Sequence, residues 1–138
     1  MEKWMPVLSE SRLFHGLTSE QLGTLLPCLQ AVLRSFKKGD LLCLAGAVQT
    51  TIGLILSGQV LIQKEDGSGH RLIIGFFGPG ELFGEVAAFA GTGCWPNTVL
   101  AEESGQALFI PFAKMSQPCC TACDAHQIML RNMLGILA

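Results

Sequence analysis

The sequence is poor in charge, and its few cations are scattered. Asp, Glu, Lys and Arg make up only 14% of the 138 residues, and the net charge is −2. Lys37 and Lys38 form the one adjacent basic pair, and no Lys or Arg occurs from Leu72 to Ala113. Direct binding of nucleic acid needs a clustered basic face. The sequence therefore argues against a nucleic-acid interface within this chain.

Long hydrophobic runs are also absent. Apolar stretches last a few residues, as at 72–74, whereas a membrane-spanning helix needs about 20. The N-terminal "MEKWMPVLSE" has no basic start followed by an apolar stretch and a small-residue cleavage site. We therefore expect no membrane segment, no export and a cytoplasmic location. There, the six cysteines are expected to be thiols or metal ligands rather than disulfides.

Catalytic motifs are missing as well. The sequence contains no nucleophile elbow, no phosphate-binding P-loop and no pair of histidines at metal-catalytic spacing. "GPGELFG" at 78–84 is rich in glycine, but no alternation of strands and helices surrounds it, as a dinucleotide site requires. We predict that this chain is not an enzyme.

What the sequence does contain is regularly spaced glycine. Turn-like motifs about 8 to 12 residues apart separate short apolar segments, a spacing typical of short strands in a sandwich or barrel. These motifs are "KKGD" (37–40), "SGQ" (57–59), "EDGSG" (65–69), "GPG" (78–80), "GTG" (91–93) and "ESG" (103–105). The pattern predicts a mainly β fold, an antiparallel barrel of about eight strands over 31–111, with helices only at the two ends.

The N-terminal part, 1–30, is predicted to be helical. Thr18 and Gln21 have the spacing of a capping box, and the leucines that follow fall on one helix face. Pro27 should bend this helix or end it early. Together with 31–111 and a helical 112–138, this segment forms one domain of 138 residues.

The C-terminal segment has an apolar surface wider than one packing contact needs. Two adjacent stripes run along the predicted helix, so that one can pack on the chain's own barrel and the other on a partner helix. The candidate dimerisation residues are Met129, Leu130, Met133, Leu134, Ile136 and Leu137. Because the sequence stops at "GILA" without a cap or polar tail, we expect the chain to be a fragment of a longer protein.

Several motifs together resemble the sensor domain of Crp/Fnr transcription regulators. They are Gly39 and Asp40 in "KKGD", Gly58 in "ILSGQV", and the stretch "GPGELFGEVA" (78–87). The resemblance covers nearly the whole chain. It implies a cyclic-nucleotide-binding β-roll of the jelly-roll or double-stranded β-helix type, a long C-terminal helix that forms a homodimer, and binding to DNA only through a following helix-turn-helix domain.

The resemblance also implies where an effector would bind. Gly84 and Glu85 match the Gly-Glu pair that contacts the nucleotide's sugar-phosphate ring, but Trp95 and Pro96 stand where nucleotide binders have Arg and Ser or Thr. An indole offers one neutral donor, and proline lacks the backbone N–H. We therefore predict weak or no binding of cyclic AMP or cyclic GMP, unless Arg71 or a partner subunit supplies a cation. The candidate effector pocket is Phe83, Gly84, Glu85, Val86, Trp95, Pro96, Asn97 and Thr98.

The aromatic residues near this pocket suit an uncharged or aromatic small-molecule effector, or they fill the barrel core. They are Phe76, Phe77, Phe83, Phe89 and Trp95. Glu85 has two roles open to it: it binds a ligand hydroxyl, or it accepts backbone N–H bonds that hold the loop closed. The second is favoured because the arginine is missing.

A metal or redox sensor is the alternative function, and a ligand-free dimerisation module is another. Cys119, Cys120, Cys123 and His126 have the spacing of one face of a helix and can offer thiolates and an imidazole to zinc or an iron-sulfur centre. Buried free cysteines are the structural alternative. Haem is a further option within the resembling family, with His15, His70 or His126 as ligand.

Overall fold

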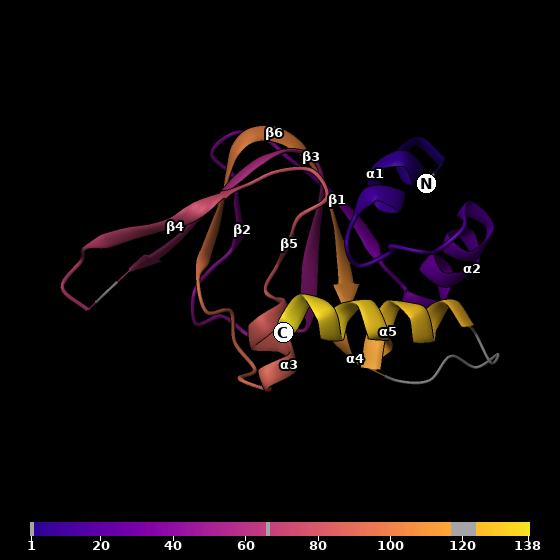
Figure 1. Ribbon diagram of the computed structural model, residues 1–138. Coiled ribbons are helices and arrows are strands. Elements are labelled where there is room, and N and C mark those ends of the chain that lie inside the picture. The colour runs from indigo at the N-terminus through magenta and orange to yellow at the C-terminus, as the bar shows by residue number, and fades with distance from the viewer. Residues whose placement is uncertain (1, 66, 117–123) are drawn as a thin grey trace.

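The computed structural model describes residues 2–65, 67–116 and 124–138 and shows one antiparallel sheet covered by helices at one end (Figure 1). The helices are η1 (Glu2–Trp4), α1 (Met5–Glu10), α2 (Ser19–Leu29), α3 (Glu85–Ala90), α4 (Phe112–Ser116) and α5 (Asp124–Leu137). The strands are β1 (Val32–Phe36), β2 (Leu41–Cys43), β3 (Thr51–Glu65), β4 (Arg71–Phe77), β5 (Leu82–Phe83) and β6 (Thr98–Pro111).

Two long strands, β3 and β6, form the centre of the sheet. They pair with each other from Thr51↔Pro111 to Gln63↔Thr98. On its other side, β3 pairs with β5 near its start and with β4 near its end. In the same way, β6 pairs with β2 near its start and with β1 near its end. The order β1-β6-β3-β4 does not close on itself. The fold is thus the predicted antiparallel β-roll, but an open one rather than a closed barrel.

The roll has six strands in the described chain instead of about eight, because two predicted turns lie inside strands. Register shifts mark β3 between Ile55 and Val60, opposite 101–107 of β6. Gly58 has φ +79, and a Cβ there would lie 2.6 Å from the Ser104 carbonyl oxygen. A Cβ at Gly105 would meet the Ser57 carbonyl. These glycines mark a close approach of two bulged backbones, where the strands bend without ending.

Side-chain alternation divides the strands between two cores. Ile52, Leu54 and Leu56 of β3 pack in a core shared with the helices, whereas Ile55 faces the interior of the roll. Phe109 of β6 also lies in the roll interior. Because neighbouring strand residues point to opposite faces, one sheet serves both cores. The sheet therefore connects the helices directly to the interior of the roll.

The helix α2 confirms the predicted capping box and corrects its C-terminus. The Thr18 hydroxyl accepts a hydrogen bond from the Gln21 backbone N–H at 3.1 Å, and the Gln21 side chain accepts one from the Thr18 N–H at 2.9 Å. Pro27 lies inside the helix, which continues to Leu29 and ends at Gln30 with φ 54. Burial of four leucines on one face outweighs the hydrogen bond that proline removes.

The C-terminal helix α5 packs into the helical core on one face. Met129 and Met133 have exposed fractions of 0% and 1%, so both belong to the chain's own core. This corrects their assignment to a dimer surface. Leu134 is 72% exposed, and Leu130, Ile136 and Leu137 are half-buried.

A side-chain amide fastens the same helix to the N-terminal segment. The Asn132 Nδ2 of α5 donates hydrogen bonds to the carbonyls of Leu13 at 2.9 Å and His15 at 2.8 Å. Unpaired carbonyls in a half-buried loop are costly, so these bonds favour one position of α5 against the loop between α1 and α2.

The cysteines correct one further expectation. Cys28 in α2 is disulfide-bonded, whereas Cys43 and Cys94 are free thiols. Burial raises the pKa of the Cys43 thiol to about 12, because the thiolate loses its hydration there, while the positive charge of Arg34 opposes the rise. Within the described ranges, none of the helices is sufficiently long and apolar to cross a bilayer.

Candidate functional site

The predicted effector site is built from a strand, a short helix and a loop that all follow one another between 82 and 98. Strand β5 ends at Phe83, Gly84 adopts φ 85, and α3 begins at Glu85. The sequence predicted helices only at the ends of the chain, so α3 is a correction. The left-handed conformation at Gly84 turns the chain from strand to helix within one residue, which glycine does with the least strain.

Backbone hydrogen bonds from a neighbouring loop hold the far part of the site. The Trp95 N–H donates to the Ala47 carbonyl at 2.9 Å, and the Gly46 N–H donates to the Trp95 carbonyl at 2.8 Å. The Gln49 N–H donates to the Gly93 carbonyl at 3.0 Å. The two bonds of Trp95 and the one at Gly93 fix this part of the backbone, so the ring is positioned by main-chain pairing rather than by local propensity.

Trp95 packs into the interior of the roll. Its side chain is 8% exposed and belongs to the core of the roll interior. The ring centroid lies 6.0 Å from that of Phe83, with 35° between the planes, and Phe83 meets Phe109 edge to face at 5.8 Å. A Cβ added at Gly84 would collide with the indole ring. The indole therefore lies directly against the Gly84 backbone.

Little space remains around the ring. The cavity next to Trp95 has a volume of about 20 Å³ and is lined by Ile62, Phe83, Gly84, Trp95, Pro96, Asn97 and Val99. That volume holds about one water molecule, whereas pockets for small organic ligands occupy roughly 300–1,000 Å³. The cavity beside Trp95 is therefore much smaller than pockets for small organic ligands.

The predicted pocket residues do not all contribute to this place. Phe83, Trp95 and Thr98 are buried, and Gly84 and Asn97 are half-buried beside them. Pro96 is exposed but still lines the small cavity. Val86 is 66% exposed on α3 and is not among the lining residues, so its assignment is corrected.

The aromatic residues also separate. Phe89 of α3 meets Phe112 of α4 edge to face at 4.8 Å, in contact with the helical core. Phe76 is exposed on β4, and Phe77 packs only partly on the roll interior. The roll thus holds Phe83 and Trp95 of the five candidates, and no common aromatic pocket unites them in the described structure.

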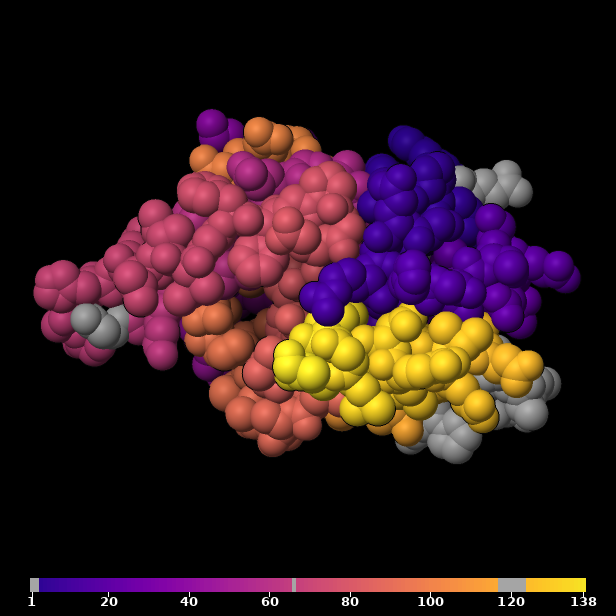
Figure 2. Space-filling model, viewed as in Figure 1, coloured from indigo at the N-terminus to yellow at the C-terminus, as the bar shows by residue number. Residues whose placement is uncertain are grey.

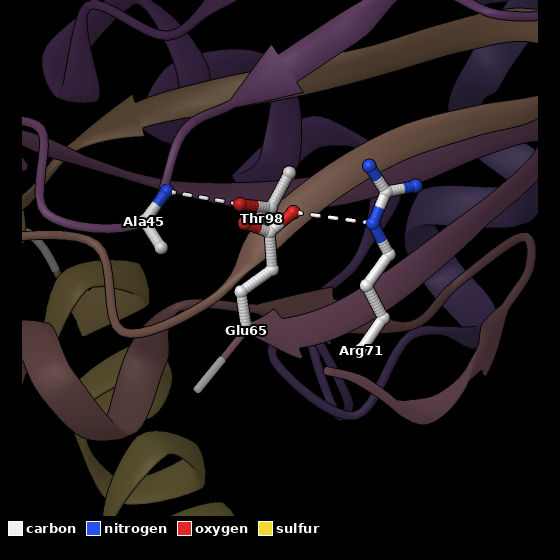
Figure 3. A network of polar contacts seen from close by, with 4 residues as sticks. All are labelled: Ala45, Glu65, Arg71 and Thr98. Atoms are coloured by element: carbon white, nitrogen blue, oxygen red, sulfur yellow. Dashed lines mark hydrogen bonds and ion pairs between the residues drawn. The ribbon is translucent and has the colours of Figure 1, made fainter. Parts of the chain in front are cut away.

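Thr98 of the predicted pocket and Arg71, the possible replacement cation, each make a polar contact with another residue (Figure 3). The Thr98 hydroxyl accepts a hydrogen bond from the Ala45 N–H at 3.2 Å. Arg71 Nε lies 3.4 Å from Glu65 Oε1, and both side chains are more than half exposed. Arg71 is therefore paired on the β3–β4 hairpin and does not replace the missing arginine of the pocket.

Glu85 stands at the start of α3 with an incompletely satisfied carboxylate. Its Oε2 is shielded from solvent and accepts no hydrogen bond from the described residues. Desolvation raises the pKa of Glu85, and a backbone N–H of the same residue partly offsets the rise. This orphaned oxygen does not support the expectation that the carboxylate holds the loop closed.

Gln49 ties down the loop instead, and the sequence analysis did not find it. Its Nε2 donates to the Gly84 carbonyl at 2.8 Å and to the Thr51 carbonyl at 3.0 Å. Gln49 lies 35 positions before Gly84, in a loop without any motif. The pairing of β3 with β5 at Gly53↔Phe83 and that of residues 46–49 with 93–95 bring the two together.

Of the alternative metal cluster, only His126 lies among the described residues. Cys119, Cys120 and Cys123 lie outside the described residues, so this site stays a prediction. His126 is buried, and its Nε2–H donates to the Met115 carbonyl at 2.7 Å. No group of three or more metal-binding side chains occurs within residues 2–65, 67–116 and 124–138. His15 is exposed, and His70 Nδ1 contacts the Ser68 hydroxyl at 2.7 Å.

Comparison with known proteins gives a consistent result. The family profile described as "Cyclic nucleotide-binding domain" matches residues 33–119. The cyclic AMP receptor protein of Thermus thermophilus is 32% identical over 77 residues, which are 56% of this chain and 35% of that protein. The chain thus corresponds to about a third of this curated relative.

Solved structures share the fold. The catabolite activator protein of Thermus thermophilus superposes with a TM-score of 0.77 at 24% identity, covering 92% of this chain and 56% of that one. The sensor domain of the transcriptional regulator DNR from Pseudomonas aeruginosa superposes with a TM-score of 0.76 at 21% identity, covering 99% and 87%. These identities are low, so the similarity of the structures establishes the fold.

Proposed function

The chain belongs to the cyclic nucleotide-binding domain family, and we propose that it is a sensor domain whose nucleotide site is closed by its own Trp95. The domain would serve a transcription regulator of the Crp/Fnr type, respond to an effector other than cyclic AMP or cyclic GMP, and contact DNA only through a separate domain. We further propose that it is non-catalytic and acts in the cytoplasm.

The observation that carries this proposal is the position of the indole. Trp95 packs between Phe83 and the Gly84 backbone, and a cavity of about 20 Å³ is left. A nucleotide could enter only if the ring left the core. Removal of a buried tryptophan from a core costs about 3–5 kcal/mol, which would be subtracted from any binding free energy.

Electrostatics act in the same direction. The only polar group that Trp95 adds is one neutral N–H, Pro96 has no N–H, and no Lys or Arg occurs from Leu72 to Ala113. Burial of a phosphate without a cation costs several kcal/mol. Arg34 approaches the Phe109 ring at 4.9 Å, but its side chain is exposed and on β1. Steric filling and missing charge thus both oppose nucleotide binding.

The contacts around Trp95 also suggest how α3 keeps its position without a bound nucleotide. Trp95 and Gln49 fix the segment that carries α3, and Phe89 of α3 packs against Phe112 of α4. Ala88 of α3 shares the helical core with Met129 of α5. Residues 83–88 run from the roll interior into the helical core that contains Met129, and we propose that a change at α3 alters the position of α5.

We propose that α5 forms a homodimer through its exposed face, with Leu134 at the centre and Leu130 and Leu137 beside it. Leu134 is 72% exposed although it lies on an otherwise well-packed helix. Leu134→Glu should shift the chain from dimer to monomer in sedimentation equilibrium. Leu72→Glu, the same change at an exposed position of β4 and outside α5, is the matched control. Equal masses for wild type and Leu134→Glu would refute the proposed interface.

The nucleotide proposal is tested by titration with cyclic AMP and cyclic GMP in a Trp4→Phe background, which leaves Trp95 as the only tryptophan. We expect no saturable change in fluorescence or heat up to millimolar nucleotide. The double variant W95R/P96S restores a cation and a hydroxyl and should bind more tightly than the parent. Saturable micromolar binding by the parent would show that Trp95 does not close the site.

A further inference from the structure

A second, larger cavity lies outside the roll, where the N-terminal and C-terminal helices meet the segment before α3. Its volume is about 520 Å³, within the range of pockets that hold small organic ligands. It shares no lining residue with the small cavity at Trp95. The lining residues are Val7, Glu10, Arg12, Phe77, Pro79, Gly80, Glu81, Leu82, Glu85 and Ile136. Figure 2 shows α1, the segment around residue 80 and the last turn of α5 meeting on one face.

One wall of this cavity is held rigidly by the sheet. The Gly80 N–H donates to the Ile55 carbonyl at 2.7 Å, and the Ile55 N–H donates to the Glu81 carbonyl at 3.0 Å. Leu82 then enters β5, which pairs with β3. The backbone of residues 80–82 is thus fixed by β3, and this part of the cavity is formed before any ligand arrives.

The charge of the lining favours a cation. Three carboxylates, of Glu10, Glu81 and Glu85, are opposed by the single guanidinium of Arg12. Glu10 and Glu81 are exposed, so solvent screens them and they contribute mainly to attraction at a distance. Across the described chain, no ion pair joins Arg12 to these carboxylates.

Glu85 differs from the other two carboxylates. It is half-buried, and its Oε2 is shielded from water without a hydrogen-bond partner. A shielded carboxylate oxygen without a hydrogen-bond partner is a costly arrangement. Desolvation is the main cause of its raised pKa, so a cation placed against the group would favour its charged form.

The remaining walls are apolar. Val7 of α1, Leu82 of β5 and Ile136 of α5 face the cavity together with Phe77 and Pro79. These side chains offer surface to an aliphatic or aromatic group and leave few other polar partners for a ligand. The cavity therefore combines an apolar surface with the half-buried side chain of Glu85.

We propose that this cavity binds a small organic cation, an amine that carries an apolar or aromatic group, with its ammonium against Glu85 and its apolar part against Phe77, Leu82 and Ile136. This inference goes beyond the proposed function, since it places an effector in a cavity that shares no lining residue with the small cavity at Trp95. A ligand there contacts α1, the start of α3 and α5 at once. Binding would favour one position of α5 relative to the roll.

The test uses three probes of similar shape and different charge, titrated into the full chain by calorimetry and by protein NMR. They are 2-phenylethylamine, the uncharged 2-phenylethanol and the anionic 3-phenylpropionate. We expect the amine to bind at least about tenfold more tightly than the alcohol, the range of a charge-assisted contact, and the carboxylate not to bind. Shifted resonances should belong to the lining residues. Equal affinity for amine and alcohol, or absence of amine binding at millimolar concentration, would overturn the proposal.

Two variants locate the site. Glu85→Gln should weaken amine binding about tenfold or more, whereas Glu103→Gln removes an equal charge at an exposed position and should leave amine binding unchanged. Ile136→Trp keeps every charge and fills the cavity, so it should abolish binding even if Glu85→Gln is unstable. Unchanged amine binding in Ile136→Trp would refute the site. Amine binding and nucleotide titration are independent, so either proposal can fail alone.

Discussion

The most direct test of the proposed closure of the nucleotide site is to remove the indole ring that fills it. Trp95→Ala takes away an indole that is 8% exposed and packed on Phe83. A buried aromatic side chain covers about 150–250 Å². At about 25 cal/mol per Å² this area corresponds to about 4–6 kcal/mol, before allowance for a compact unfolded state.

That allowance lowers the transfer contribution by roughly 10–40%, and the remaining value agrees with the 3–5 kcal/mol typical of Trp→Ala changes in cores. We therefore expect Trp95→Ala to lose about 4 kcal/mol of unfolding free energy. This is a large share of the roughly 5–15 kcal/mol that stabilises a domain. Urea denaturation followed by circular dichroism measures the loss without relying on tryptophan fluorescence.

The vacated space provides a second, independent measurement. Indole has the shape of the deleted ring and should bind in Trp95→Ala, raising its Tm in proportion to the logarithm of indole concentration. Trp4→Ala is the matched control, because Trp4 is half-buried on the N-terminal helices. Its loss should be smaller, and indole should not restore it.

Two outcomes would refute the reasoning. A loss below about 1 kcal/mol in Trp95→Ala would mean that the ring is not a core element, since such values are typical of exposed positions. An equal indole-induced rise of Tm in wild type and variant would mean that indole binds elsewhere. The first outcome would show that Trp95 does not close the nucleotide site, and the second would show that its removal leaves no space that indole fills.

Three further predictions follow from the backbone, the thiols and the buried carboxylate. Gly58→Ala should destabilise the chain by about 1–3 kcal/mol in urea denaturation, because φ is +79 and the added Cβ would lie 2.6 Å from the Ser104 carbonyl oxygen. Gly23→Ala, with open space around it in α2, is the control and should be neutral or stabilising. Equal effects of the two changes would contradict the close approach of β3 and β6. Cys43 should resist alkylation by iodoacetamide at pH 8, because burial raises the pKa of its thiol to about 12, whereas the half-buried Cys94 should react. Peptide mapping measures both reactions. Rapid labelling of Cys43 in the folded chain would show that its thiol is accessible. Glu85 has a folded-state pKa above its ordinary 4.5, so its stabilising contribution is complete below pH 4.5 and is lost as pH rises through the folded pKa. Glu85→Gln should therefore raise Tm relative to wild type at pH 8 and much less at pH 4, with Glu81→Gln as control; a Tm difference independent of pH would refute the titration.

Local patterns accounted for much of the fold. The capping box of α2 and the leucines on its buried face are properties of neighbouring residues, and both appear in the structure. The family resemblance rested on motifs such as "GPGELFGEVA", and the match to residues 33–119 confirms it. Short-range periodicity is readable because side-chain direction repeats with a fixed period in helices and strands.

The errors have a common cause in distance along the chain. Gly58 and Gly105 have the composition of turns, but they allow close contact between β3 and β6, whose residues are far apart in sequence. The helix α3 is only six residues long, too short to produce a helical period. Met129 and Met133 were indistinguishable by sequence from the exposed stripe, because only the packed sheet determines which face of α5 is covered.

For the candidate site, too, some features follow from local sequence and others only from contacts between distant segments. From the sequence alone, Trp95 and Pro96 replace the groups that hold a phosphate, and the absence of cations from Leu72 to Ala113 follows directly from residue identity. Only the tertiary structure shows that the indole fills the space next to Gly84, that Gln49 fastens the loop, and that Glu85 lines another cavity with Val7 and Ile136. Charge and hydrogen-bonding capacity belong to single residues, whereas filled volume and burial depend on segments that meet only when the chain folds.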